Sequence, residues 1–181
     1  KARLYFDQHI TAVQDLITFL IRDLYETAKN ENTTIELSKT EAKLLLSTKL
    51  AAAKSKNPKE CEIFIVEGDS AGGGCKEMRR SMYQAVLPLR GKILNARKTT
   101  LARMLSNPEI STMVLAFACG LGSNYDESKL RYHKIIITVD ADIDGTHIAI
   151  LLITFFWTYM PDLIRNGHVY ILNSPLYVNV L

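Results

Sequence analysis

The chain has 181 residues, 48% of them hydrophobic, and a formal net charge of +3. This length fits one domain or one domain with an appendage, and the interspersed charges exclude a wholly disordered chain. The three cysteines form no CxxC pair and their number is odd, which argues against a disulfide framework or a cysteine metal site and favours reduced thiols in a cytoplasmic protein.

The first 57 residues are predicted to be a separate helical segment, because they contain no glycine and no proline. Apolar residues at helical spacing predict a helix from Ala12 to Leu24, and a second helix is predicted over Thr40–Ala53. Residues 55–58 are predicted to be a linker. The resulting division is a helical segment, 1–57, followed by a domain, 58–181.

Strands and helices alternate in that domain. The predicted elements are a strand over 61–67, a helix over 74–84, a basic loop over 88–95, helices over 100–105 and 108–118, a buried strand over 134–140, a long helix over 146–164 and a strand over 169–172. This alternation predicts an α/β fold in which helices flank a parallel sheet. The apolar stretch 148–157 is too short to cross a membrane, and no signal peptide is expected.

Four carboxylates follow the two buried strands. Glu67 ends the first strand, Asp140 ends the second, and Asp142 and Asp144 follow in the same turn. Ligands of parallel sheets gather at the carboxyl ends of the strands, so the four side chains are expected to converge within a few ångströms. Such a cluster repels itself unless it holds a cation, and its hard oxygen ligands favour Mg²⁺, with Mn²⁺ as the alternative.

Two other interpretations of these aspartates fit the sequence less well. One aspartate is enough to cap the following helix, but three of them plus a glutamate exceed that need. Residues 140–145 also match the first half of an EF-hand loop, but Leu151 stands where that loop requires a glutamate, and a strand precedes it.

The segment Gly68–Gly72 fits the G-x-S-x-G pattern of α/β-hydrolases, which makes a serine esterase using Ser70 the main alternative function. An aspartate of the cluster and His147 or His168 even follow in hydrolase order. That interpretation leaves Glu67 and the basic loop without a role, and no HGGG-type oxyanion segment is present. A Walker A motif is excluded because Gly74 stands where lysine is required. Consecutive glycines also allow backbone N–H groups to approach a phosphate closely.

Positive charge is concentrated between residues 76 and 103. Eight basic residues face only Glu77 there, which gives the window a net charge of +7 and the rest of the chain −4. Within it, Arg90 and Lys92 are two residues apart and point the same way in an extended loop, and Asn95 offers a further hydrogen bond. A nucleic-acid backbone suits such a field, although a solvated face is the simpler explanation of charge alone.

Three segments carry a resemblance to a known family. They are Glu67-Gly-Asp-Ser-Ala-Gly-Gly73, Leu87-Pro-Leu-Arg-Gly-Lys-Ile-Leu-Asn95 and Asp140-Ala-Asp-Ile-Asp-Gly-Thr-His-Ile148. In this order they resemble the signatures of the toprim domain of type IIA DNA topoisomerases, as found in bacterial gyrase B and topoisomerase IV B subunits. Another toprim enzyme, a primase or a nuclease, is the nearer alternative, and the basic loop favours the topoisomerase.

The resemblance implies a Rossmann-like toprim fold and a role for each matched residue. Glu67, Asp140 and Asp142 would be catalytic and would bind Mg²⁺ together with Asp144. Arg90, Lys92 and Asn95 would contact double-stranded DNA. Asp69 and Arg90 fall where the family contacts fluoroquinolone-type drugs.

The resemblance also implies partners. A gyrase A-like breakage–reunion subunit would supply the nucleophilic tyrosine in an A2B2 heterotetramer, so the chain alone would be inactive. ATP would bind only in an N-terminal domain outside this sequence, and residues 1–57 would include the end of a transducer domain. Tyr132 follows an arginine as the partner's tyrosine does, but packing is its expected role.

Overall fold

The computed structural model describes residues 46, 49–91, 93–140 and 142–172. A single four-stranded sheet in the order β2-β1-β3-β4 lies at its centre, and every pair of neighbouring strands is parallel. The strands are β1 (Glu62–Glu67), β2 (Gln84–Leu89), β3 (Lys134–Thr138) and β4 (Val169–Leu172). The predicted parallel α/β fold is therefore confirmed.

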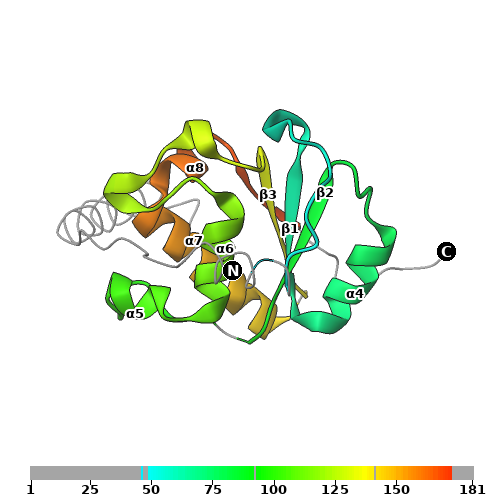
Figure 1. Cartoon of the computed structure of the whole chain (residues 1–181). Helices are drawn as coiled ribbons and strands as arrows, with labels where there is room; N and C mark the ends of the chain where they lie inside the picture. Colours follow the sequence, from blue (N-terminus) through cyan, green and yellow to red (C-terminus); the bar gives the residue numbers. More distant parts are fainter. Residues whose placement is uncertain (1–45, 47–48, 92, 141, 173–181) are drawn as a thin grey trace, which may run out of the picture.

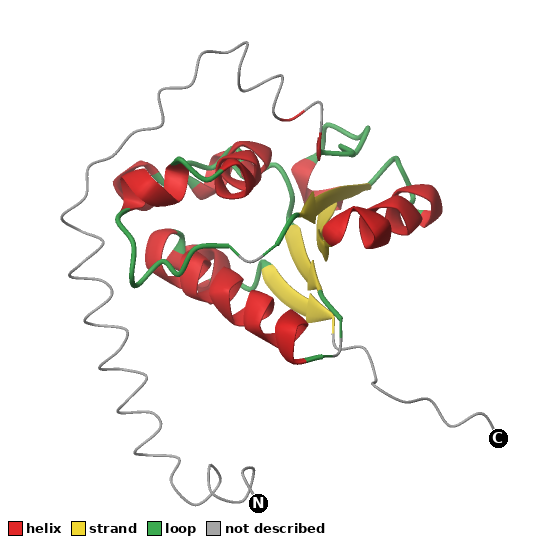
Figure 2. Ribbon diagram, turned by 90° about the horizontal axis from the view of Figure 1, so that it is seen from below, coloured by secondary structure: helices red, strands yellow, loops and turns green. Residues whose placement is uncertain are grey.

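Helices cover the two faces of the sheet unequally. Figures 1 and 2 show α4 on one side of the sheet and α5 to α8 grouped on the other. The helices are α4 (Gly68–Met78), α5 (Leu101–Leu105), α6 (Pro108–Phe117), α7 (Ile143–Tyr159) and α8 (Pro161–Arg165), with short 3-10 turns η1 (Pro58–Glu60), η2 (Gly122–Asn124) and η3 (Glu127–Lys129). No helix among the described residues is long and apolar enough to cross a membrane.

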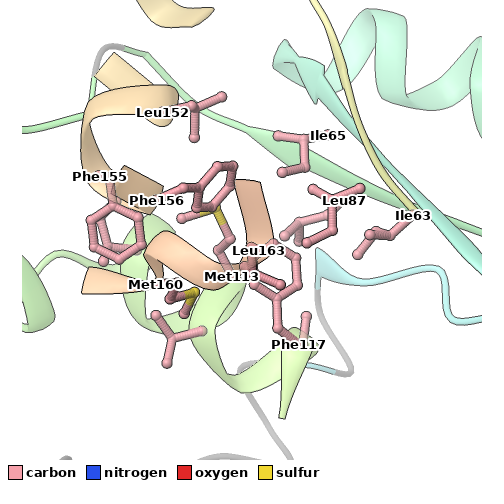
Figure 3. Close-up of a cluster of buried hydrophobic side chains, with 14 of the residues drawn as sticks. Ile63, Ile65, Leu87, Met113, Phe117, Leu152, Phe155, Phe156, Met160 and Leu163 are labelled. Atoms are coloured by element: carbon pink, nitrogen blue, oxygen red, sulfur yellow. The ribbon is translucent and has the colours of Figure 1, made fainter. Parts of the chain in front are cut away.

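The hydrophobic core lies between the sheet and the larger group of helices. Figure 3 shows Ile63, Ile65 and Leu87 of the sheet facing aromatic residues of the helices, among them Phe117 and Phe156. All five side chains are almost fully buried, and the two phenylalanine rings lie 5.8 Å apart between centroids. Burial of each such side chain stabilises the fold by about 1.5–3 kcal/mol, so this layer holds the strand ends in fixed positions.

The segment that follows β1 differs from the prediction. Helix α4 begins at Gly68, immediately after the strand, and not at residue 74. It packs closely against β2, a strand that was not predicted, and a Cβ atom at Gly72 would lie 2.9 Å from the Cβ of Pro88. A proline is tolerated in β2 because β2 is the first strand of the sheet, and an edge strand has fewer ladder bonds to lose.

The long helix predicted over residues 146–164 is in fact two helices. Helix α7 begins earlier, at Ile143, and ends at Tyr159, and Pro161 opens the separate helix α8. Proline lacks an N–H group and is suited to a first helical turn, which explains the break. The early start of α7 matters for the site because Asp142 becomes its N-cap residue.

Residues 51–55 form a strap along β2. The second predicted helix does not reach Ala53, because Ala51 forms an antiparallel bridge with Val86, with backbone hydrogen bonds of 2.9 and 3.0 Å. The Ser55 N–H group donates to the Met82 carbonyl at 2.8 Å. The strap is therefore held beside β2 up to Ser55, the first residue of the predicted linker. The first predicted helix lies outside the described residues.

Two arginines from other parts of the chain bind the strap through its backbone carbonyls. Arg131 donates from Nη2 to the Ser55 carbonyl at 2.5 Å and to the Ala53 carbonyl at 3.4 Å. Arg79 bridges the Ala52 and Gln84 carbonyls, at 3.4 and 2.8 Å. These bonds tie the strap to the start of β2 and to the segment before β3, so its path is fixed by tertiary contacts.

Candidate metal and nucleic-acid site

The site lies at the carboxyl edge of the two central strands. Strands β1 and β3 pair in register, with Val66 opposite Thr138, so Glu67 and the residues after Thr138 reach the same edge. Helices α4 and α7 begin at this edge, at the bottom of Figure 1. Glu67 ends β1 as predicted, whereas β3 ends at Thr138 and Asp140 lies two residues beyond it.

Glu67 is the least exposed of the four carboxylates. Its Oε2 atom is buried and has no hydrogen-bond partner among the described residues, and its side chain does not cap α4. Burial raises its pKa, and the negative charges of Asp140, Asp142 and Asp144 raise it further, against a hydrogen bond from the Asp140 backbone. All three aspartates are therefore near enough to oppose the ionised form of Glu67.

The aspartate turn is shaped by the start of α7. Asp142 accepts the Gly145 N–H group on Oδ1 at 2.6 Å, which is the helix-capping role that one aspartate of the cluster can fill. Gly145 is required at this point, because a Cβ atom there would lie 2.2 Å from the Asp140 carbonyl oxygen. Asp144 lies exposed in the first helical turn. The turn is thus held tightly while its carboxylates face solvent.

The four carboxylates do not converge as closely as the sequence predicts. No three His, Cys, Asp or Glu side chains among the described residues stand close enough to hold a metal ion. One reason is that the cap fixes an oxygen of Asp142 toward its own helix. The chemistry of the set nevertheless fits a hard divalent cation, since its donors are carboxylate oxygens and Glu67 presents a buried oxygen without a partner in the described part of the chain.

The basic loop leaves this same edge from the end of β2. Arg90 is exposed and forms an ion pair with Asp69 of α4, with Nε and Oδ2 2.7 Å apart. Asn95 accepts the Arg97 N–H group at 2.9 Å, so its side chain also stabilises a turn. Ile93 and Ala96 are buried in the core and anchor the loop. Lys92 lies outside the described residues.

Ser70 lacks the geometry of a hydrolase nucleophile. It is an exposed residue inside α4 and makes no hydrogen bond to a histidine or carboxylate among the described residues. A nucleophile elbow is a strained turn, but Ala118 is the one non-glycine residue with a positive φ in the described part of the chain. The G-x-S-x-G pattern is here the first turn of a helix.

The remaining side chains singled out from the sequence are accounted for by packing or exposure. Tyr132 is 1% exposed and belongs to the core, as expected of a packing tyrosine. His168 is buried and hydrogen-bonded, and His147 is exposed on α7. The sequence did not predict that Asp69 and Arg90 are paired, because no local pattern connects residues on different elements.

These features define a class: an α/β protein with a parallel sheet, a carboxylate cluster at its carboxyl edge and a basic loop beside it. Residues 62–173 match the family model of the Toprim domain. The chain therefore belongs to the Toprim domain family.

Characterised relatives give the resemblance more detail. The chain is 52% identical over 146 residues to the B subunit of DNA gyrase from Campylobacter jejuni, which is 79% of the chain and 19% of the relative. It is 54% identical over 133 residues to the B subunit of the type 2 topoisomerase from Aquifex aeolicus, covering 74% and 17%. It is 58% identical over 132 residues to the B subunit of DNA gyrase from Staphylococcus aureus, covering 73% and 20%. The chain thus spans about a fifth of the length of these relatives.

Proposed function

We propose that this chain is the metal-binding cleavage and religation core of a type IIA DNA topoisomerase. The single observation that carries the proposal is Glu67, whose buried, unpartnered oxygen faces the charges of Asp140, Asp142 and Asp144 at one strand edge of the described structure. An arrangement in which burial, and then the charges of three neighbouring aspartates, raise the pKa of a carboxylate is suited to a cation-binding role. The similarity to gyrase and type 2 topoisomerase subunits supports the assignment.

Glu67, Asp140 and Asp142 would hold Mg²⁺, with Asp144 supporting them and Mn²⁺ as the alternative ion. The bound ion would supply Lewis-acid stabilisation of charge on the scissile phosphate. The protein's own contribution is to hold Glu67 at the strand end and to fix the aspartate turn through the Asp142 cap and Gly145.

The basic loop would bind the DNA backbone beside this cluster. Arg90, Lys92 and Asn95 are the proposed contacts, and Asp69 and Arg90 would also meet drugs of the fluoroquinolone type. Contacts of this kind supply affinity and salt dependence but not sequence choice. The Asp69–Arg90 ion pair supports the idea that Arg90 is held at the edge, since it fixes the side chain next to α4.

The chemistry would also require a partner. A gyrase A-like subunit would supply the tyrosine that attacks the DNA, in an A2B2 assembly, and ATP would bind in a part of the protein outside this sequence. Tyr132 is buried in the core, which supports assigning the nucleophile to another chain. The chain alone would therefore cut no DNA, and its site of action would be the cytoplasm.

The test is Mg²⁺-dependent cleavage of supercoiled plasmid by the full-length protein together with its breakage–reunion subunit. Glu67→Gln is expected to lower cleavage at least about 100-fold, as loss of a group that stabilises transition-state charge does. Glu77→Gln is the matched control, because Glu77 is an exposed glutamate on α4 away from the proposed ligands. Full cleavage by Glu67→Gln would refute the proposed metal site.

A second toprim activity is tested in the same samples. A primase would synthesise primers on single-stranded template, and a nuclease would cut DNA without a covalent protein link. The relatives support the topoisomerase, because those named above are subunits of gyrases and of a type 2 topoisomerase. Primer synthesis, or cleavage that needs no second subunit, would overturn the assignment.

A further inference from the structure

A buried histidine lies away from the proposed site, in the turn between α8 and β4. The side chain of His168 is 8% exposed, and its backbone is fixed by two hydrogen bonds. The His168 N–H group donates to the Leu163 carbonyl, and the Ile135 N–H group donates to the His168 carbonyl. The imidazole therefore has little freedom to reorient.

Both ring nitrogens of His168 face oxygen atoms. Nδ1 lies 2.7 Å from the backbone carbonyl oxygen of His133, and Nε2 lies 3.0 Å from Oε1 of Glu127. A carbonyl oxygen accepts hydrogen bonds and cannot donate them, so Nδ1 must carry a proton. An ionised carboxylate is also an acceptor only, so Nε2 must carry a proton as well if Glu127 is ionised.

The surroundings of Glu127 keep it ionised. Hydrogen bonds from His168 and from Asn166 lower the pKa of Glu127, against the opposing effect of burial. Asn166 donates from Nδ2 to the other carboxylate oxygen, Oε2. Both oxygens of Glu127 are thus occupied as acceptors, which leaves the second proton on the histidine.

We propose that His168 is a doubly protonated imidazolium that clasps three parts of the chain together. One N–H group holds the residue before β3, and the other holds η3 through Glu127, while the backbone of His168 leads into β4. Removing the Nε2 proton would break the bond to Glu127 and leave Asn166 as the side chain that joins η3 to the turn before β4. The clasp would be a connection outside the site proposed above.

Among the charged groups near His168, Glu127 is the one that contacts its ring. The ring of His133 stands edge-on to it, with centroids 4.9 Å apart. Charged residues of η3 and α8 form their own ion pairs, Asp126 with Lys129 at 3.0 Å and Asp162 with Arg165 at 3.1 Å. Tyr125 lies near Glu127 and is neutral, because burial raises its pKa well above its usual range.

The clasp is tested by nitrogen-15 NMR of the histidine side chains in the 181-residue chain at pH 7. The wild-type His168 signal, assigned with the variant His168→Gln, is expected to show protons on both ring nitrogens. Glu127→Gln offers Nε2 an amide that can donate to it, so Nε2 is expected to lose its proton and one ring proton is expected to remain. Asp126→Asn is the matched control, because Asp126 pairs with Lys129 and not with His168.

Two outcomes would overturn the proposal. One is a lone pair on Nε2 in the wild-type chain at pH 7, and the other is two ring protons that persist in a folded Glu127→Gln variant. A pH titration of the wild-type chain provides an independent measurement if that variant does not fold. When His168 loses a proton, the amide signals of Glu127 and Asn166 are expected to shift with it. Signals that stay in place would refute the clasp.

Discussion

The Nε atom of Arg90 lies 2.7 Å from Oδ2 of Asp69, which joins the basic end of β2 to the first turn of α4. Both side chains are more than half exposed, so the pair contributes no more than about 1 kcal/mol to stability. Its more important effect is electrostatic. The negative charge of Asp69 offsets the positive charge of Arg90, the residue that is proposed to bind a DNA phosphate.

Asp69→Asn is therefore expected to bind DNA more tightly, since it removes the negative charge that competes with phosphate for Arg90. Arg90→Ala is expected to weaken binding and to reduce the slope of log affinity against log salt by about one. Fluorescence anisotropy with a duplex at several salt concentrations measures both. An unchanged slope in Arg90→Ala would mean that this arginine does not contact a phosphate.

Removing the charge of Glu67 should stabilise the metal-free protein. The pKa of Glu67 is raised in the folded state, so the folded chain binds this proton more tightly than the unfolded chain does. Stability attributable to this group is present at low pH and is lost as the pH rises through the interval between the two pKa values. Glu67→Gln should consequently melt at a higher temperature than wild type at pH 7 in EDTA.

Added Mg²⁺ should reverse that order. An ion that binds the folded state alone raises the melting temperature of the wild-type chain, and the glutamine of the Glu67→Gln variant would supply a neutral and weaker ligand. The measurement is a thermal melt of each protein over a Mg²⁺ series. Equal shifts in both proteins would exclude Glu67 as a ligand.

Gly72→Ala should be strongly destabilising, because the new Cβ atom would lie 2.9 Å from the Cβ of Pro88 and would push α4 from β2. Overpacking of this kind costs about 1–3 kcal/mol. Gly73→Ala is the matched control on the same helix, where a Cβ atom would meet nothing within 4 Å, and its helix propensity should stabilise by roughly 0.5–1 kcal/mol. Urea unfolding of both variants distinguishes close packing from a general effect of losing glycine.

Arg131→Ala should loosen the strap, because it removes the donors to the Ala53 and Ser55 carbonyls. The expected cost is about 1–3 kcal/mol, since hydrogen bonds from a charged donor are lost and a partly buried carbonyl is left unsatisfied. Hydrogen exchange should then rise at Ser55, whose N–H group donates to the Met82 carbonyl. Arg80→Ala is the control, because Arg80 is an exposed arginine.

Local pattern was sufficient for the elements that have strong periodicity or clear boundaries. The run Lys134–Thr138 is a strand as expected, although it ends before the predicted Asp140 and only Ile135 and Ile137 in it are buried. The strand over 169–172 has the predicted ends. Asn107 and Pro108 mark the start of α6 with an N-cap and a first-turn proline, so that helix was also predictable.

The missed features depend on tertiary contacts. Pro88 argues against a strand, and only the edge position of β2 makes it acceptable. Ala51 belongs to an apolar, alanine-rich stretch that favours a helix, but Val86 supplies a backbone partner from the sheet. At the site, the sequence indicated which carboxylates share an edge, whereas the turning of Asp142 toward Gly145 depends on where α7 begins.

The strap has a mechanical consequence for the basic loop. Ala51 is hydrogen-bonded to Val86 in β2, which pairs with β1, and Arg90 follows Val86 by only four residues. A force on the chain that precedes Ala51 would therefore act on β2 directly, through the Ala51–Val86 bridge. It would reach the end of the strand, next to Arg90.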